Sequence, residues 1–123
     1  ILSDVEKQIR RRILLQTKTL ILTPRYLVEL SDDICAIIPL PEVLWIYDHA
    51  AMRRTIKGRQ LSYTIHVVTM KGEEYTLTGK SHREVSAIYH ELNTRYPNFF
   101  FGYSKEHQEM VQYVLHEMKN EKA

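Results

Sequence analysis

The chain has 123 residues and a formal net charge of +2, from 17 basic and 15 acidic side chains. Its length fits a single domain over residues 1–123. Its composition, 44% hydrophobic and 26% charged, excludes a disordered tail, a collagen-like repeat and a disulfide scaffold. The near balance of charge argues against a dedicated nucleic-acid binder.

The single cysteine and the short apolar runs indicate a soluble chain in a reducing compartment. Cys35 cannot form an internal disulfide, and its apolar neighbours predict a buried thiol in a reducing environment. No apolar run approaches the roughly 18 residues of a membrane span, so we expect these residues to be soluble. Because the chain begins at Ile1 rather than Met, we also expect it to be the soluble part of a longer protein.

A helix is predicted at the start of the chain. Residues 3–6 have the form of a capping box, with Ser3 at the N-cap and Glu6 three residues later. Val5, Ile9 and Ile13 then recur at helical spacing.

About six antiparallel strands are predicted next, with a break at Pro39 and Pro41, which lack the backbone donor that a sheet requires. Residues 42–52 fit either a helix or a strand, and we favour a strand because 44–47 are strand formers. Residues 53–60, polar and containing Gly58, are expected to form a long hairpin loop. The expected strands are 20–22, 26–30, 34–38, 42–52, 62–70 and 74–78.

Two helices are predicted after the strands. Ser81 and Glu84 form a second capping box, and the helix that follows should end before Pro97. Ser104 should cap a last helix with an apolar face formed by Met110, Val111, Val114, Leu115 and Met118. The aromatic run 99–101 between them is expected to pack between helices or to form a partner-binding patch. The order of elements predicts an α+β domain in which helices cap an antiparallel bent sheet or partial barrel.

Two stretches resemble an uncharacterised family of bacterial, often membrane-associated proteins: residues 37–47, IIPLPEVLWIY, and residues 96–104, YPNFFFGYS. The resemblance covers roughly residues 18–118 and implies a pleckstrin-homology-like fold, a bent sheet closed at one end by a helix. At the position of the lipid site of that fold, Lys18 and Arg25 are present, but a second arginine after Arg25 is missing.

Four cations lie within seven residues at the predicted hairpin tip: Arg53, Arg54, Lys57 and Arg59. They suggest contact with an acidic membrane surface, a phosphate or an acidic partner, although such a run is more commonly a solvated loop. A second cluster, Arg10, Arg11 and Arg12, on the first helix could face lipid headgroups or nucleic acid, or could be an ordinary exposed helix face.

The six histidines lack metal-ligand spacing, so no metal site or cofactor is expected. His66 alternates with apolar neighbours and should be a half-buried strand residue, while Asp48 and His49 should point to opposite faces of their strand. No nucleophile elbow or phosphate-binding glycine loop is present, so we expect no enzyme.

The sequence therefore favours a cytoplasmic, non-enzymatic interaction module, tethered to the inner face of a membrane by a segment outside this chain. Its expected partner is a protein or an anionic membrane surface. One alternative is a small ligand-binding protein or hydrolase with a cleft between sheet and helices, lined by Tyr47, His49 and His66. Another is a weak nucleic-acid binder that uses the basic clusters.

Overall fold

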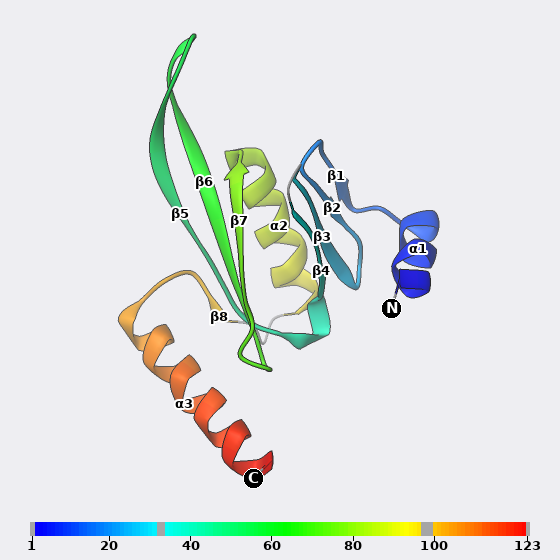
Figure 1. Cartoon of the computed structure of the whole chain (residues 1–123), viewed down its shortest axis with the longest axis vertical. Helices are drawn as coiled ribbons and strands as arrows, with labels where there is room; N and C mark the ends of the chain where they lie inside the picture. The colour runs from blue at the N-terminus through cyan, green and yellow to red at the C-terminus, as the bar shows by residue number, and fades with distance from the viewer. Residues whose placement is uncertain (1, 32–33, 97–99, 123) are drawn as a thin grey trace.

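The computed structural model describes residues 2–31, 34–96 and 100–122, without the side chains at positions 2, 31, 34, 35, 53, 55, 121 and 122. The predicted α+β class is confirmed (Figure 1). The helices are α1 (Leu2–Arg11), α2 (His82–Arg95) and α3 (Lys105–Lys122), with a short 3₁₀ helix η1 (Leu40–Glu42). The predicted end of a helix before Pro97 is confirmed by the end of α2 at Arg95, whereas the predicted burial of Cys35 lies outside what is described.

The described strands form two four-stranded sheets, and neither closes into a barrel. Sheet A has the order β1-β2-β3-β4, and sheet B has the order β7-β6-β5-β8. All pairings are antiparallel except that of β8 with β5. The strand bounds are β1 Leu15–Gln16, β2 Leu20–Leu22, β3 Tyr26–Ser31, β4 Ile34–Pro39, β5 Val43–Thr55, β6 Gly58–Thr69, β7 Glu74–Lys80 and β8 Phe100–Phe101.

Eight strands appear where about six were expected, because β1 and β8 contain only two residues each. Two residues are too few to show the alternation by which a strand is recognised. The strand assignment of 42–52 is confirmed by β5, and the break after β4 is confirmed by η1.

The prediction of a long loop at 53–60 is wrong, because most of these residues are paired in β5 and β6. Thr55 pairs with Gly58, so β5 and β6 continue to a tight turn at Ile56 and Lys57. Gly58 has a φ of 118°, which a residue with a side chain rarely adopts. The polar residues of this segment belong to a two-stranded ribbon that pairs with no further strand among the described residues, so they need no apolar alternation.

The main core lies between the two sheets and α2, which stands between them in Figure 1. Sheet A contributes Leu20, Leu22, Leu27 and Ile38, sheet B contributes Ile46, Ile65, Val67 and Leu77, and α2 contributes Val85, Ile88 and Leu92.

Two smaller clusters hold the outer helices. Val5 of α1 packs with Tyr26 and Val28 of β3 on sheet A. Val111 of α3 packs with Trp45 and neighbouring residues of sheet B.

The helix caps are partly as predicted. The capping box of Ser81 and Glu84 is confirmed, and Ser104 accepts a hydrogen bond from the His107 amide at 3.0 Å. Ser3, however, lies inside α1 rather than before it, since the helix already includes Leu2. Ile13 lies after α1 has ended and is exposed. Met110, expected on the apolar face of α3, is also exposed.

Buried polar contacts join sheet A to the rest of the domain. Lys80 at the end of β7 reaches Glu29 on β3, with Nζ 2.9 Å from Oε1 and 2.8 Å from Oε2. Glu84 Oε2 of α2 accepts hydrogen bonds from Thr17 at 2.7 Å and Thr19 at 2.9 Å. These contacts fix the orientation of sheet A relative to α2 and sheet B.

Candidate functional site

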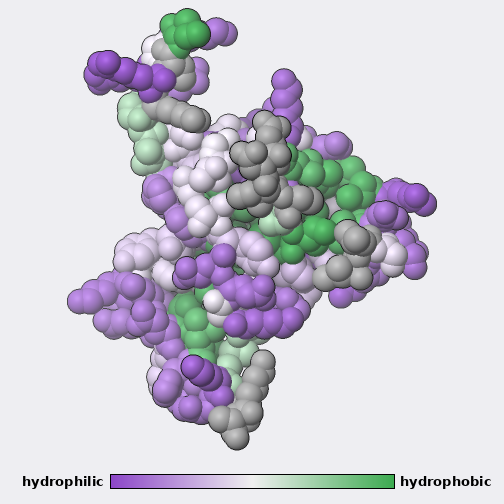
Figure 2. All heavy atoms as spheres, viewed as in Figure 1, coloured by the Kyte–Doolittle hydropathy of each residue, from purple (hydrophilic) through white to green (hydrophobic). Residues whose placement is uncertain are grey.

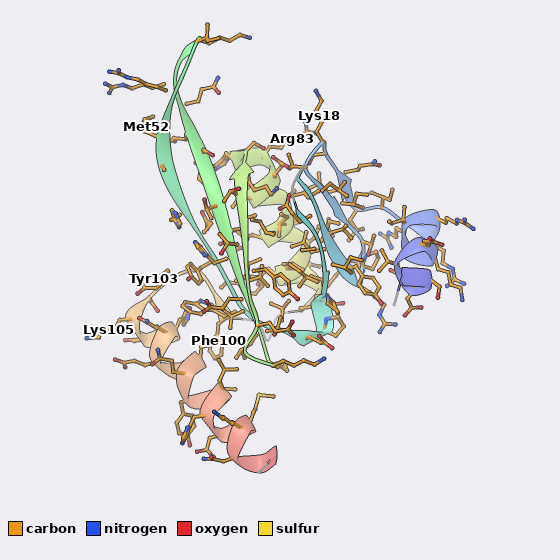
Figure 3. All side chains as sticks on the ribbon, viewed as in Figure 1. Lys18, Met52, Arg83, Phe100, Tyr103 and Lys105 are labelled. Atoms are coloured by element: carbon orange, nitrogen blue, oxygen red, sulfur yellow. The ribbon has the colours of Figure 1, made fainter. Side chains whose placement is uncertain are left out.

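The outer half of the β5–β6 hairpin extends well beyond the rest of the molecule (Figure 1). We call residues 51–61 the arm. Every arm residue whose burial is described is exposed. Met52, labelled in Figure 3, lies on β5 at the base of this extension. An exposed ribbon of this kind adds no apolar core, so its side chains are available for contacts outside the domain.

Three described cations gather near the end of the arm: Arg54, Lys57 and Arg59. Arg54 lies directly opposite Arg59 in the strand register, and both are exposed. None of the three forms an ion pair with another described residue. From position 49 to position 72 the sequence has no acidic residue. The arm is therefore a concentrated positive charge without internal compensation.

The fourth predicted cation, Arg53, is placed by its backbone only. It pairs with Gln60, one step before the Arg54–Arg59 pair. Successive strand residues point to opposite faces, so positions 53 and 54 belong to different faces of the arm.

Apolar side chains are interleaved with these cations. Ile56 in the turn is fully exposed. Met52 and Leu61 pair across the strands, two positions before Arg54 and two after Arg59, on the same face as the arginines. They are 61% and 53% exposed. Figure 2 shows hydrophilic and hydrophobic side chains next to each other at the end of the arm.

The second predicted basic cluster lies elsewhere. Arg10 and Arg11 end α1, Arg12 follows it, and all three are exposed. In Figure 1, α1 lies on the far side of sheet A from the arm. The structure therefore does not bring the two predicted basic clusters together.

A row of stacked rings occupies the face of sheet B away from α2. Tyr47 stacks on His66 with ring centroids 4.7 Å apart, and His66 stacks on His49 at 4.9 Å. On the other side of Tyr47 lies Trp45, with the two ring centroids 4.3 Å apart, and Tyr103 contacts both of these rings. Trp45 Nε1 donates a 2.9 Å hydrogen bond to the carbonyl of Gly102.

The strand register brings these rings together, because Tyr47 pairs directly with His66. His66 is half-buried, as predicted. Burial lowers the pKa of His66, and the neighbouring His49 lowers it further, while Glu74 acts in the opposite direction. Burial also raises the pKa of Tyr47, with help from Glu74 and Tyr103.

The face of sheet B toward α2 carries Asp48 rather than the three residues that were expected to line a cleft. Asp48 points to the opposite face from His49, as predicted, and accepts a hydrogen bond from Tyr89 of α2. On that side a hollow of about 410 Å³ is lined by Asp48, Tyr89, His90, Asn93, Phe101 and Gly102. Burial and Asp48 together raise the pKa of Tyr89 strongly, so this phenol is a hydrogen-bond donor rather than a base. Tyr47, His49 and His66 do not line this hollow, since they lie on the other face of sheet B.

Phe100 and Phe101 take the packing role expected of the aromatic run. Phe100 packs with the cluster beneath α3, and Phe101 packs with the main core, because consecutive strand residues face opposite ways. Position 99 lies outside the described residues.

Sequence reasoning found the arm cations and grouped Tyr47, His49 and His66 in one alternative, but it missed Trp45 and Tyr103. The β5–β6 register shows that Tyr47 and His66 are direct neighbours. Within the described residues, no group of three or more His, Cys, Asp or Glu side chains is arranged to hold a metal ion. None of the described helices is long and apolar enough to cross a membrane.

These features define an α+β domain with two sheets, a closing helix and a projecting basic arm. A family model described as a domain of unknown function, DUF6709, matches residues 4–111, and the chain belongs to that family. The match includes both sheets, α2 and the entire arm. Neither the curated proteins nor the solved structures contain a match to this chain.

Proposed function

We propose that this domain is a non-enzymatic, membrane-proximal interaction module whose arm binds an anionic lipid surface. The observation that carries the proposal is the placement of Arg54 opposite Arg59, with Lys57 beside them and no acidic residue in the arm. Like charges directly opposite each other destabilise a strand pair. An anionic surface against the arm relieves that repulsion.

The apolar tip favours lipid over a small soluble anion. Ile56 is fully exposed at the turn, two residues beyond Arg54. Two strand residues span about 6–7 Å. Interfacial apolar side chains enter the boundary between headgroups and acyl chains by about 5–10 Å. Ile56 can therefore reach the acyl boundary while the arginines remain among the headgroups.

The expected affinity is weak. Each cation near an anionic leaflet contributes about 1 kcal/mol, so the three described cations contribute about 3 kcal/mol. This is enough to orient a domain that is already held near a membrane. We accordingly place the domain at the cytoplasmic side of a bacterial membrane, tethered by a segment outside residues 1–123. We also propose that its fold is pleckstrin-homology-like, which the closure of two mainly antiparallel sheets by α2 supports.

The test is flotation of the protein with vesicles of phosphatidylcholine containing 30% phosphatidylserine, and with vesicles of phosphatidylcholine alone. Removing two cations with Arg54→Gln/Arg59→Gln should weaken binding to anionic vesicles about 30-fold, the equivalent of about 2 kcal/mol. Arg10→Gln/Arg11→Gln removes the same charge from α1 and is the matched control. It should leave most of the binding intact.

Two results would contradict the proposal. Equal flotation of the arm variant and the α1 variant would show that the arm does not contact the lipid surface. Equally strong binding to neutral and anionic vesicles would show that the positive charge of the arm does not drive binding. The nucleic-acid alternative would be favoured if the protein bound single-stranded DNA as strongly as anionic vesicles and this binding fell steeply with salt. Capture of a protein through the arm in the absence of lipid would favour a protein partner.

A further inference from the structure

We propose that His49 and His66 form a two-imidazole binding site for a late first-row divalent metal ion, with Cu²⁺ bound most tightly. The two side chains come from neighbouring strands, β5 and β6, on the face of sheet B away from α2. Nδ1 of His49 and Nε2 of His66 lie 3.0 Å apart, so the two ring nitrogens point at each other. This site is separate from the arm and does not depend on the proposed membrane contact.

The separation of the nitrogens is close to that required by a shared metal ion. Zinc–imidazole bonds are about 2.0–2.1 Å long. At that bond length two ligating nitrogens lie about 3.3 Å apart in a tetrahedral arrangement and about 2.9 Å apart at adjacent corners of a tetragonal one. The 3.0 Å separation of the two ring nitrogens lies between these values, so either arrangement requires a shift of only a few tenths of an ångström. His49 is exposed, so a small rotation of its ring meets no packing resistance. The metal ion lies to one side of the line between the two nitrogens and replaces their hydrogen bond, and the ring that donated it carries its proton on its other nitrogen instead.

Neighbouring rings hold one ligand in place. Tyr47 stacks on His66 with an interplanar angle of 15°, and Tyr47 packs in turn against the buried Trp45. An imidazole fixed in this way loses little rotational freedom on binding, which favours affinity. His66 is therefore the preorganised ligand and His49 the mobile one.

The ligand set determines which ions bind. Across the described residues, no third His, Cys, Asp or Glu completes the pair, so water fills the remaining coordination positions. Two imidazoles with oxygen ligands suit a tetragonal Cu²⁺ ion, and the usual order of affinities places Cu²⁺ above Ni²⁺ and Zn²⁺. The site is thus open, unlike a closed structural zinc site.

The experiment titrates untagged protein with Cu²⁺ and, separately, Zn²⁺ at pH 7.5, by calorimetry and by electron paramagnetic resonance of the Cu²⁺ complex. Loss of a partner that merely orients a ligand weakens metal binding by about 10–100-fold, so His49→Gln and His66→Gln should each weaken Cu²⁺ binding at least tenfold. His90→Gln, a change at an exposed histidine of α2, is the matched control and should have no effect. Circular dichroism melting of each variant tests whether the fold is retained.

The expected spectrum of the 1:1 complex shows two nitrogen ligands in the wild type and fewer in either variant. Cu²⁺ should bind more tightly than Zn²⁺. Undiminished Cu²⁺ affinity in His49→Gln or His66→Gln, or an equal loss in His90→Gln, would overturn the proposal. Tighter binding of Zn²⁺ than of Cu²⁺ would overturn the assignment of the ion.

Discussion

Replacing Lys80 with methionine should strongly destabilise the domain. The Lys80 side chain is 0% exposed and its partner Glu29 is 4% exposed, so the substitution leaves a carboxylate buried without a counter-charge. Breaking a buried ion pair from one side costs about 3–5 kcal/mol. A domain of this size has a free energy of unfolding of about 5–15 kcal/mol, so the variant loses a large share of its stability.

Urea unfolding followed by circular dichroism measures this loss. The control is Lys71→Met, because Lys71 lies 3.3 Å from Glu42 in an exposed pair with side chains 59% and 39% exposed. An exposed pair contributes about 0–1 kcal/mol. The double variant Lys80→Met/Glu29→Leu should recover most of the loss, since an apolar pair of similar size replaces both charges. A loss below about 1 kcal/mol for Lys80→Met alone would refute the view that this pair joins the two sheets.

Further predictions concern Glu84 and α3. Burial alone would raise the pKa of Glu84. Hydrogen bonds from Thr17, Ser81 and Thr19 outweigh this effect and hold the pKa below its usual value. Its stabilising contribution is therefore present above the unfolded pKa of about 4.3 and is lost as pH falls through the lower folded pKa. Urea unfolding should show wild type more stable than Glu84→Gln at pH 7, with a smaller difference at pH 3; an equal difference at both would contradict this. Val111→Ala should cost about 1.5–3 kcal/mol in the same assay because Val111 is 3% exposed, whereas Met110→Ala, at a 51% exposed position, should cost less than about 0.5 kcal/mol. Similar losses for both would show that α3 does not pack on sheet B as described.

The parts of the fold that follow from local chemistry could be predicted. The cap at Ser81 and the proline break after β4 are confirmed because each depends on a few adjacent residues. The strand at 42–52 is confirmed because a hairpin partner follows it. The expectation of a loop at 53–60 was wrong because a polar run indicates solvent exposure, and the exposed ribbon that these residues form is as polar as a loop.

The candidate sites divide in the same way. The arm cations are adjacent in sequence, so composition alone identifies them. Their opposition, Arg54 against Arg59, requires the register of β5 and β6. His49 and His66 are 17 residues apart, and no spacing rule connects them. The buried Lys80–Glu29 pair spans 51 residues and is likewise invisible until the sheets are assembled.

The claim that the arm enters an anionic lipid surface is tested most directly at its tip. In a Cys35→Ala background, Ile56→Cys carries an environment-sensitive fluorophore, and Tyr113→Cys on α3, an exposed position, carries the same label as the control. Addition of vesicles with 30% phosphatidylserine should shift the emission of the label at position 56 to the blue, with no shift at position 113 and none with neutral vesicles. An unshifted label at position 56, under conditions in which the protein floats with the vesicles, would contradict the claim.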